Sequence, residues 1–189
     1  KKMSLRYAVE DSKNGCAYSL YNIITPKVGL SYIENMNFSK IVQQDYTLSS
    51  GLGGLHHGTN TVEMANAYST LENHGEYRQA DCISSILDAS GNEIYEEPES
   101  KTVYTRSASD QMTDILEGVL NSSAGTAKGL KWSSASDVAA AAKTGTTNDN
   151  NVAWFCGYTP YYTISVWVGY DYPKSVKGLW GNTYPAYIW

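Results

Sequence analysis

Five consecutive residues, Lys143 to Thr147, combine one cation, three hydroxyls and a glycine in a pattern that can bind an anion. Lys143 supplies a fixed point charge. Side chains two apart on a strand face the same way, so Thr144 and Thr146 can hold one carboxylate together. Gly145 between them allows close approach of a ligand, and a free strand edge offers N–H groups to an oxyanion. The alternative is a lysine at a turn beside a strand.

A second polar group, Ser12-Lys13-Asn14, lies in a stretch that interrupts a helical pattern. Small polar residues with a glycine, as in residues 11–15, favour caps and turns over helix interiors. A serine and an asparagine two apart in such a turn can project together into a cleft. A turn that only caps a helix is the alternative.

Several other chemical signatures are missing from the sequence. It has no phosphate-loop pattern, no H-E-x-x-H pair and no G-x-S-x-G elbow. Adjacent histidines such as His56 and His57 are poorly placed to chelate one metal together, so we predict no metal site and no cofactor. The three cysteines form no C-x-x-C, and we expect unpaired, mostly buried thiols at Cys16, Cys82 and Cys156.

Charge and length narrow the class of protein further. The 189 residues suffice for one domain with a sizeable core, and the net charge of −5 argues against nucleic acid as a partner. No apolar run reaches the roughly 18 residues that span a membrane. Because residue 1 is a lysine, we expect the sequence to be a piece of a longer protein.

The elements that must position these motifs begin with helices. Residues 3–25 read as two short helices joined by the turn at 11–15, and Thr25-Pro26 ends the second. Residues 45–60 are loop-like. The sequence therefore predicts that the serine motif lies between two helices.

Two later helices have clear boundaries. Asn60 and Glu63 have capping-box spacing before a helix that stops near Gly75. Another helix begins at Ser107. It is predicted to bury Met112, Ile115, Leu116, Val119 and Leu120.

The last third of the chain reads as strands. Residues 152–158 and 162–170 form the strongest strand pair, residues 138–147 fit a third strand beside them, and residues 83–96 read as a separate hairpin. Aromatic residues in the strands favour a core role, at Trp154, Phe155 and Trp167. The expected fold is α+β, with an antiparallel sheet flanked by helices.

The S-x-N and K-T-G elements resemble two of the three motifs of the penicillin-recognising serine enzymes. Further segments look like the transpeptidase domain of class A, bifunctional penicillin-binding proteins, in the same order over nearly the whole chain: 52–54, 61–77, 87–96, 125–127 and 143–171. The run K-T-G-T-T-N followed by A-W-F-x-G-Y resembles these transpeptidases more than β-lactamases.

The resemblance implies a peptidoglycan D,D-transpeptidase that binds stem peptides ending in D-Ala-D-Ala and is the target of β-lactams. By this resemblance, Ser12 relays a proton toward the leaving amine. Asn14 holds the amide carbonyl of the acyl donor, and Lys143 raises the positive potential of the cleft. Lys13, the variable position of the motif, is expected to face solvent.

The resemblance also assigns the substrate-binding strand. Thr144 and Thr146 would bind the terminal carboxylate, and the backbone N–H of Thr146 would form half of an oxyanion hole. Gly145 and Thr147 belong to the same substrate-binding stretch.

The third motif of the family, S-x-x-K, is missing: no lysine here has a serine three residues before it. We therefore expect residues 1–189 to be the C-terminal part of such a domain, inactive alone, with the S-x-N region at 1–137 and the K-T-G strand and later strands at 138–189. The missing portion would come from another chain, or the fragment would associate with itself.

The full-length protein is expected to act at the extracytoplasmic face of a bacterial membrane, anchored by a segment outside this sequence. Two alternatives stay open. One is a D,D-carboxypeptidase or β-lactamase with the same motifs. The other is a non-catalytic module that binds peptidoglycan or β-lactams without turnover.

Overall fold

The computed structural model describes residues 2–130 and 138–189. Its helices are α1 (Leu5–Glu10), α2 (Asn14–Ile24), α3 (Pro26–Asn35), α4 (Thr61–Glu72), α5 (Arg106–Asn121) and α6 (Tyr184–Ile188), with short 3-10 helices η1 (Gln43–Asp45) and η2 (Leu48–Leu52). Its strands are β1 (Glu76–Tyr77), β2 (Lys101–Thr102), β3 (Ala141–Thr146), β4 (Val152–Tyr158) and β5 (Thr163–Gly169).

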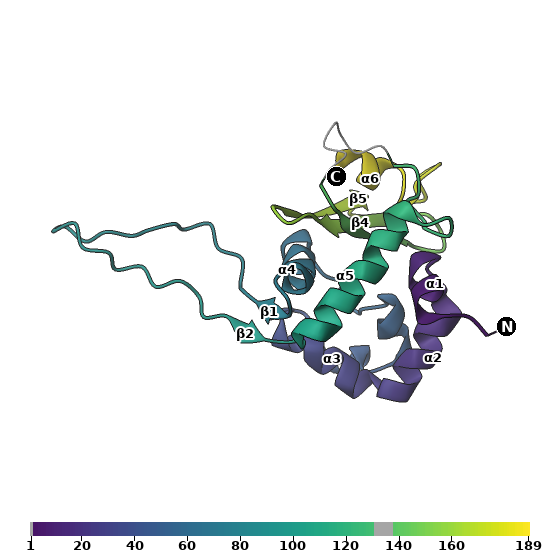
Figure 1. Cartoon of the computed structure of the whole chain (residues 1–189), viewed down its shortest axis with the longest axis horizontal. Coiled ribbons are helices and arrows are strands. Elements are labelled where there is room, and N and C mark those ends of the chain that lie inside the picture. The colour runs from purple at the N-terminus through teal and green to yellow at the C-terminus, as the bar shows by residue number, and fades with distance from the viewer. Residues whose placement is uncertain (1, 131–137) are drawn as a thin grey trace.

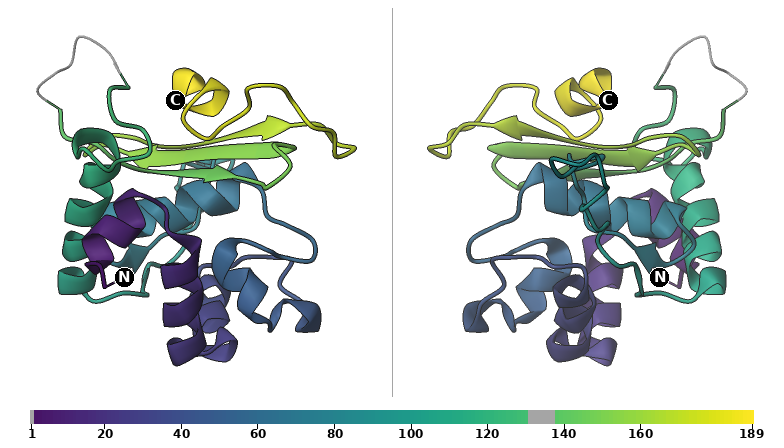
Figure 2. Two further views of the ribbon diagram at one scale, coloured as in Figure 1. Left: turned by 90° about the vertical axis from the view of Figure 1, so that its right-hand side faces the viewer. Right: turned by 90° about the vertical axis from the view of Figure 1, so that its left-hand side faces the viewer.

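The main sheet is antiparallel, with the strand order β3-β4-β5. Helices α4 and α5 pack on one face, with the N-terminal helices beyond them, and α6 covers the other face (Figure 2). The third strand expected from the sequence is present, and its register pairs Lys143 with Cys156. This arrangement confirms the predicted α+β class.

The hydrophobic core lies on both faces of this sheet. On the helical side Leu116 and Val119 of α5 pack near β3, and on the α6 side Phe155 contacts the ring of Trp189. The alanines that open β3 are almost fully buried in this core, which explains their small size: a larger side chain would separate α5 from the sheet.

The N-terminal helices differ from the prediction in one respect. The break at residues 11–13 is present, but the chain does not leave the helical region after Pro26. Pro26 is instead the first residue of α3, a position where its missing N–H and fixed φ cost nothing. Thr25 makes the corner between the two helices with a φ of 72°.

The predicted cap of α4 is confirmed, and the predicted start of α5 is slightly displaced. The side chain of Asn60 accepts a hydrogen bond from the N–H of Glu63 at 2.9 Å. Helix α5 starts one residue before the prediction, because Thr105 is its N-cap and accepts from the N–H of Ala108. Both helices therefore begin where the polar residues satisfy their first free N–H groups.

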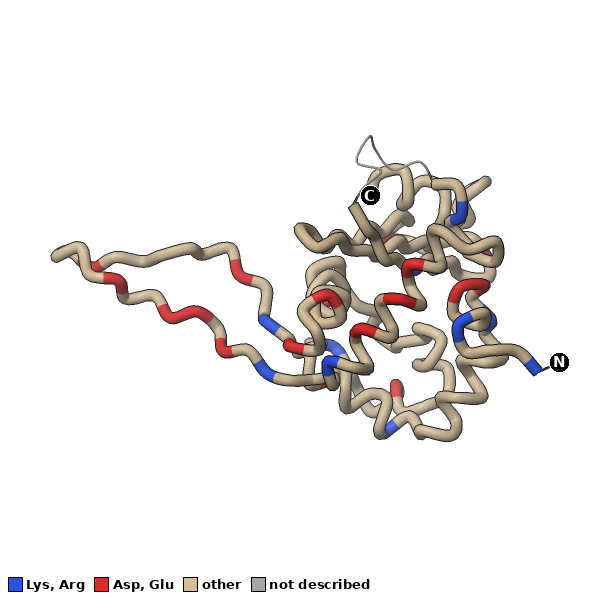
Figure 3. The backbone as a smooth tube through the Cα atoms, viewed as in Figure 1, with Lys and Arg blue, Asp and Glu red and all other residues tan. Residues whose placement is uncertain are grey.

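Residues 78–100 form an arm that extends away from the body (Figure 1). The predicted hairpin at 83–96 is a turn closed by one bridge, between Leu87 and Glu93, and not a pair of regular strands. A two-stranded hairpin without a packed face is only marginally stable, which explains the short pairing. The arm carries several of the acidic residues (Figure 3).

Several burial expectations need correction, and on α5 Met112 and Ile115 are only half-buried. Trp167 is 36% exposed, because β5 is an edge strand of the sheet, whereas Phe155 is fully buried as predicted. Cys82 lies exposed on the arm and Cys16 is half-buried. All three cysteines are unpaired, as expected, and only Cys156 is buried.

Candidate functional site

Ser12 occupies an unusual backbone position at the end of α1. The N–H of Lys13 donates to the carbonyl of Ala8, and the N–H of Ser12 donates to the carbonyl of Val9. This pair of bonds is a Schellman motif, whose left-handed residue is usually glycine. Here that residue is Ser12, with a φ of 52°. Its side chain is therefore held in one direction by a conformation that costs free energy.

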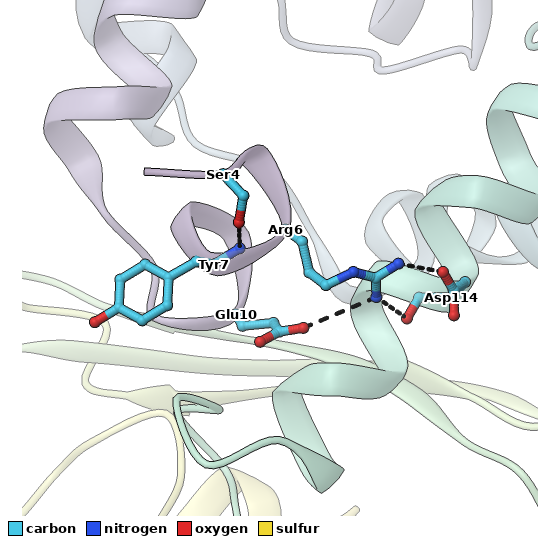
Figure 4. Close-up of polar contacts among 5 residues, drawn as sticks. All are labelled: Ser4, Arg6, Tyr7, Glu10 and Asp114. Carbon is cyan, nitrogen blue, oxygen red and sulfur yellow. Dashed lines mark hydrogen bonds and ion pairs between the residues drawn. The ribbon is translucent and has the colours of Figure 1, made fainter. Parts of the chain in front are cut away.

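Helix α1 is fixed to α5 by charged side chains (Figure 4). The guanidinium of Arg6 donates to the backbone carbonyl of Asp114 at 3.0 Å and pairs with its carboxylate. Glu10 is buried, lies 3.9 Å from Arg6 and packs where Gly118 leaves room on α5. Because α1 is held in this way, the turn that follows it has a defined position over the sheet.

Lys143 of β3 meets this turn. Its Nζ donates to Ser12 Oγ at 2.7 Å and to the carbonyl of Thr144 at 2.8 Å. The structure thus brings together two motifs that are 131 residues apart in the sequence. Burial lowers the pKa of Lys143 to about 8, and the thiol of its cross-strand neighbour Cys156 acts weakly in the opposite direction.

This contact defines what the pair can do. When Lys143 donates to Ser12 Oγ, the hydroxyl hydrogen of Ser12 remains available for another acceptor. A hydroxyl so placed can pass a proton between a group in the cleft and a nearby amine. With a pKa near 8, Lys143 also exists in charged and neutral forms at physiological pH.

The two threonines of the strand have other partners. Side chains alternate along β3, so Thr144 and Thr146 project from the face opposite Lys143. Thr144 Oγ1 lies 2.7 Å from Thr126 Oγ1. Thr146 Oγ1 accepts from the N–H of Gly181 at 2.9 Å. The two hydroxyls are thus oriented by separate segments, one after α5 and one before α6.

The free edge of β3 presents N–H groups. The N–H of Thr147 donates toward β4, to the carbonyl of Val152. Because N–H groups alternate between the two sides of a strand, the N–H groups of Thr144 and Thr146 point outward from the sheet. This is the direction that an oxyanion donor requires.

Gly145 has space around its α-carbon. A methyl group added there would meet only Cβ of Trp154, at an ordinary 3.4 Å. The fold itself therefore does not require glycine at position 145. By contrast, a methyl group on Gly181 would lie 2.8 Å from the Gly145 carbonyl oxygen and from Thr144 Cβ, so packing requires that glycine.

Two predicted site residues, Asn14 and Thr147, lie outside this contact, as does Lys13, which was expected to face solvent. Asn14 is exposed at the first position of α2, and its side chain has no polar partner among the described residues. Lys13 pairs with Asp11 at 2.7 Å and is 44% exposed, consistent with its predicted solvent position. Thr147 uses its hydroxyl in the β3–β4 turn, where it accepts from the N–H groups of Asn151 and Val152.

The family-model comparison matches residues 1–184 to the penicillin binding protein transpeptidase domain. The chain belongs to this family. The resemblance inferred from the two motifs is thereby confirmed, and relatives named penicillin-binding protein 1A are among those that match.

Two curated relatives and one solved structure show the extent of the similarity. The chain is 32% identical to penicillin-binding protein 4 of Bacillus subtilis (strain 168), over 99% of the chain and 29% of the relative. It is 34% identical to penicillin-binding protein 1A of Clostridium novyi (strain NT), over 92% of the chain and 20% of the relative. The PonA1 protein of Mycobacterium tuberculosis in complex with penicillin V aligns with a TM-score of 0.79 and 23% identity, over 98% of the chain and 54% of that structure.

The chain thus spans less than a third of the length of these curated relatives. Within the described ranges of this penicillin-binding domain, no helix has the length and apolarity needed to cross a bilayer. The same ranges contain no group of three metal-ligating side chains that could hold a metal ion.

Two residues of this transpeptidase-domain site were missed by motif reasoning: Thr126 and Gly181. Thr126 binds the strand hydroxyl directly, and its backbone N–H donates to the carbonyl of Glu10, next to the serine turn. The segment Gly125-Thr126-Ala127 carried the resemblance, so a threonine between two small residues was an available signal. The sequence contains no such signal for Gly181, because glycine is required there only by its close packing against β3.

Proposed function

We propose that this chain forms part of the cleft of a peptidoglycan D,D-transpeptidase that also reacts with β-lactams. The observation that carries the proposal is the 2.7 Å contact between Lys143 Nζ and Ser12 Oγ in a chain of the penicillin-binding transpeptidase family. The similarity to PonA1 solved with penicillin V supports the β-lactam part of the proposal.

The proposed reaction is acyl transfer through a serine. A serine hydroxyl attacks the penultimate carbonyl of a stem peptide ending in D-Ala-D-Ala, and D-alanine leaves with the proton that the serine lost. An amine of a second peptide then displaces the enzyme, and the serine regains its proton. Ser12 relays the proton to the leaving amine, and Lys143 keeps Ser12 oriented and the cleft positive.

The strand residues bind the substrate in this proposal. Thr144 and Thr146 take the terminal carboxylate, and the outward N–H of Thr146 binds the oxyanion. The room above Gly145 lets the substrate backbone approach β3, which supports a functional reason for glycine. Asn14, whose side chain has no polar partner within residues 2–130 and 138–189, holds the amide carbonyl, and Thr147 shapes the end of the strand.

The nucleophile is proposed to come from outside these 189 residues, because no S-x-x-K occurs within them. It would be supplied by a further segment of the protein, docked beside the serine turn, or by another chain. Strand β5 supports this idea, since it is an edge strand whose exposed side chains include Ile164 and Trp167. Self-association through the same edge is the alternative.

We place the whole protein at the extracytoplasmic face of the membrane, where peptidoglycan lies, with its anchor in a segment outside this chain. A non-catalytic module that binds peptidoglycan or β-lactams is a second candidate, favoured by the same missing S-x-x-K. A D,D-carboxypeptidase is distinguished by its product, because it would release D-alanine without forming cross-links.

The test uses the full-length protein that contains these residues. With a lipid-linked or soluble pentapeptide ending in D-Ala-D-Ala, we expect D-alanine release together with cross-linked dimers. Ser12→Ala should abolish both products, whereas Ser84→Ala, on the exposed arm, should leave both unchanged. Binding of penicillin without D-alanine release would favour the non-catalytic module and contradict the proposal.

A further inference from the structure

A concave site lies where β3 begins. A pocket of about 350 Å³ is enclosed by the last turn of α4, the outer side of α5, the residues that open β3 and the end of β4. This volume falls in the lower range for small-molecule sites. None of its lining residues contributes to the Ser12–Lys143 contact.

The floor of the pocket is apolar and already formed. Ala140, Ala141 and Tyr158 line it, and each is at most 4% exposed. The hydroxyl of Tyr158 lies 2.8 Å from Thr113 Oγ1, which fixes the ring from the side of α5. A ligand that reaches this floor would meet a rigid apolar surface with two hydroxyls at its border.

The rim of the pocket is acidic, but its carboxylates differ in their partners. Asp110 pairs with His74 at 2.7 Å, and Asp114 pairs with Arg6. Glu72 and Glu117 also line the pocket, and neither has an ion-pair partner within the described residues. Among the described residues the rim therefore has two carboxylates without an ion-pair partner, one on α4 and one on α5.

The carboxylates of Glu72 and Glu117 affect the pKa of Tyr158 in the floor of the pocket. Burial raises the pKa of Tyr158 to about 12, and Glu117 and Glu72 raise it further by their charge, while the bond to Thr113 opposes the shift. Both carboxylates line the same pocket of about 350 Å³ as Tyr158 and Ala140, so a ligand in the pocket would lie beside them. The pocket combines an apolar surface, which favours a hydrocarbon group, with a rim that favours a positive charge.

We propose that this pocket binds a small organic cation, with its ammonium group between Glu72 and Glu117 and its apolar group over Ala140 and Tyr158. A metal ion is disfavoured, because in the part of the chain that the structure describes no three acidic, histidine or cysteine side chains are placed to hold one. An anion or a neutral polar ligand would face these two carboxylates.

The test is a titration of the full-length protein that contains these residues with benzylamine, followed by amide NMR shifts at low ionic strength. We expect shifts at Glu72, Glu117 and Tyr158 that saturate with a Kd on the order of 1 mM, as suits a ligand of this size. Benzyl alcohol, which has nearly the same shape without the charge, should bind about tenfold or more weakly, because it lacks the charge-assisted bond.

Variants place the binding in this pocket. The double variant Glu72→Gln/Glu117→Gln should weaken benzylamine binding about tenfold. The control Glu97→Gln/Glu99→Gln makes the same change of charge on the exposed arm and should bind like wild type. Ala139→Phe, at an exposed lining position, should block the pocket without disturbing the core.

Three results would overturn the proposal. The first is no saturable shift at these residues, and the second is equal binding of benzylamine and benzyl alcohol. The third is binding of Mg²⁺ at the same residues in place of the amine. Because the readout is binding, it does not depend on whether the cleft at Ser12 is catalytically active.

Discussion

Two sites along strand β3 carry opposite chemistry. In the middle of the strand Lys143 is a half-buried cation that donates to Ser12, and at its start Ala140 and Ala141 lie under a rim of carboxylates. The turn after α1 supplies a hydroxyl to the first site, whereas α4 and α5 supply acidic side chains to the second. The residues that face the strand therefore determine the charge of each site.

The Lys143 contact and the acidic pocket also differ in how their polar groups are satisfied. Around Lys143 each polar group of the contact has an internal partner. Ser12 makes its bond to Lys143 from a strained, left-handed backbone conformation. In the pocket, Glu72 and Glu117 have no ion-pair partners in the described chain. The proposed catalytic role relies on groups that internal hydrogen bonds hold in place. The proposed binding role relies on carboxylates that remain available to a ligand.

Removing the cation should produce the largest effect. In the full-length protein, Lys143→Met removes the charge and the donor to Ser12, so we expect penicillin acylation to slow by about 100-fold to 1000-fold. The measurement is the second-order rate of acylation by stopped-flow or gel labelling. Lys128→Met, which removes an exposed lysine, is the control and should react at the wild-type rate. If Lys143→Met slowed acylation by less than about threefold, the claim that Lys143 is the functional cation of the cleft would be contradicted.

Variants of Ser12 test the role of the turn after α1 that contacts Lys143. Ser12→Ala and Ser12→Gly both remove the hydroxyl, so both should slow acylation by about 100-fold. They should differ in stability, because glycine relieves the strain of a φ of 52° and alanine does not. Urea unfolding should place Ser12→Gly about 1 kcal/mol above Ser12→Ala. Equal stabilities would contradict the claim that the turn is strained.

The pH profile follows from the pKa of Lys143. The positive charge that favours an anionic substrate is present below pH about 8 and is lost above it, so acylation should fall about tenfold through that range. Lys143→Arg keeps its charge and should move this fall to higher pH. A flat profile from about pH 7 to about pH 9, one unit on either side of the transition, would contradict the assignment.

Stability should change with pH in the opposite sense. The folded pKa of Lys143, about 8, lies below its ordinary 10.5, so the unfolded chain binds more protons between these values. The free energy of unfolding of wild type relative to Lys143→Met should therefore rise with pH from about 8 to about 10.5. Urea unfolding of both proteins across this range measures the difference, and a fall would give the wrong sign.

The smallest effects separate function from packing at two glycines. Gly145→Ala should leave stability within about 1 kcal/mol of wild type, because the added methyl meets only Trp154, and should slow acylation about tenfold. Gly181→Ala should destabilise the fold by about 1–3 kcal/mol through its clash with β3. Urea unfolding with acylation rates distinguishes the two; similar losses of stability would remove the distinction.

Much of the architecture could be predicted from local patterns. Alternation predicted β4 and β5, a capping residue predicted the start of α4, and small polar residues predicted the turn at Ser12. The start of α5 was predicted one residue late, because Thr105 was not recognised as its cap. Helix α3 was missed because Pro26 was taken only as a stop, although proline also begins helices. Trp167 was assigned to the core because the exposure of an edge strand depends on the order of strands in space.

The candidate site was predictable in its residues and not in its contacts. The motifs singled out Ser12 and Lys143, but their 2.7 Å contact is a product of tertiary packing. The partners of Thr144 and Thr146 come from segments after α5 and before α6, which no local rule relates to β3. The acidic pocket was not predicted either, because Glu72 and Glu117 lie on helices that are distant in sequence.

The most direct test of the central claim is intact-protein mass spectrometry after incubation with penicillin V. The claim is that these 189 residues carry the serine-turn and strand parts of the cleft without the nucleophile. We predict no covalent adduct on the 189-residue chain and a single penicilloyl adduct on the full-length protein. A stoichiometric adduct on the 189-residue chain would contradict the account.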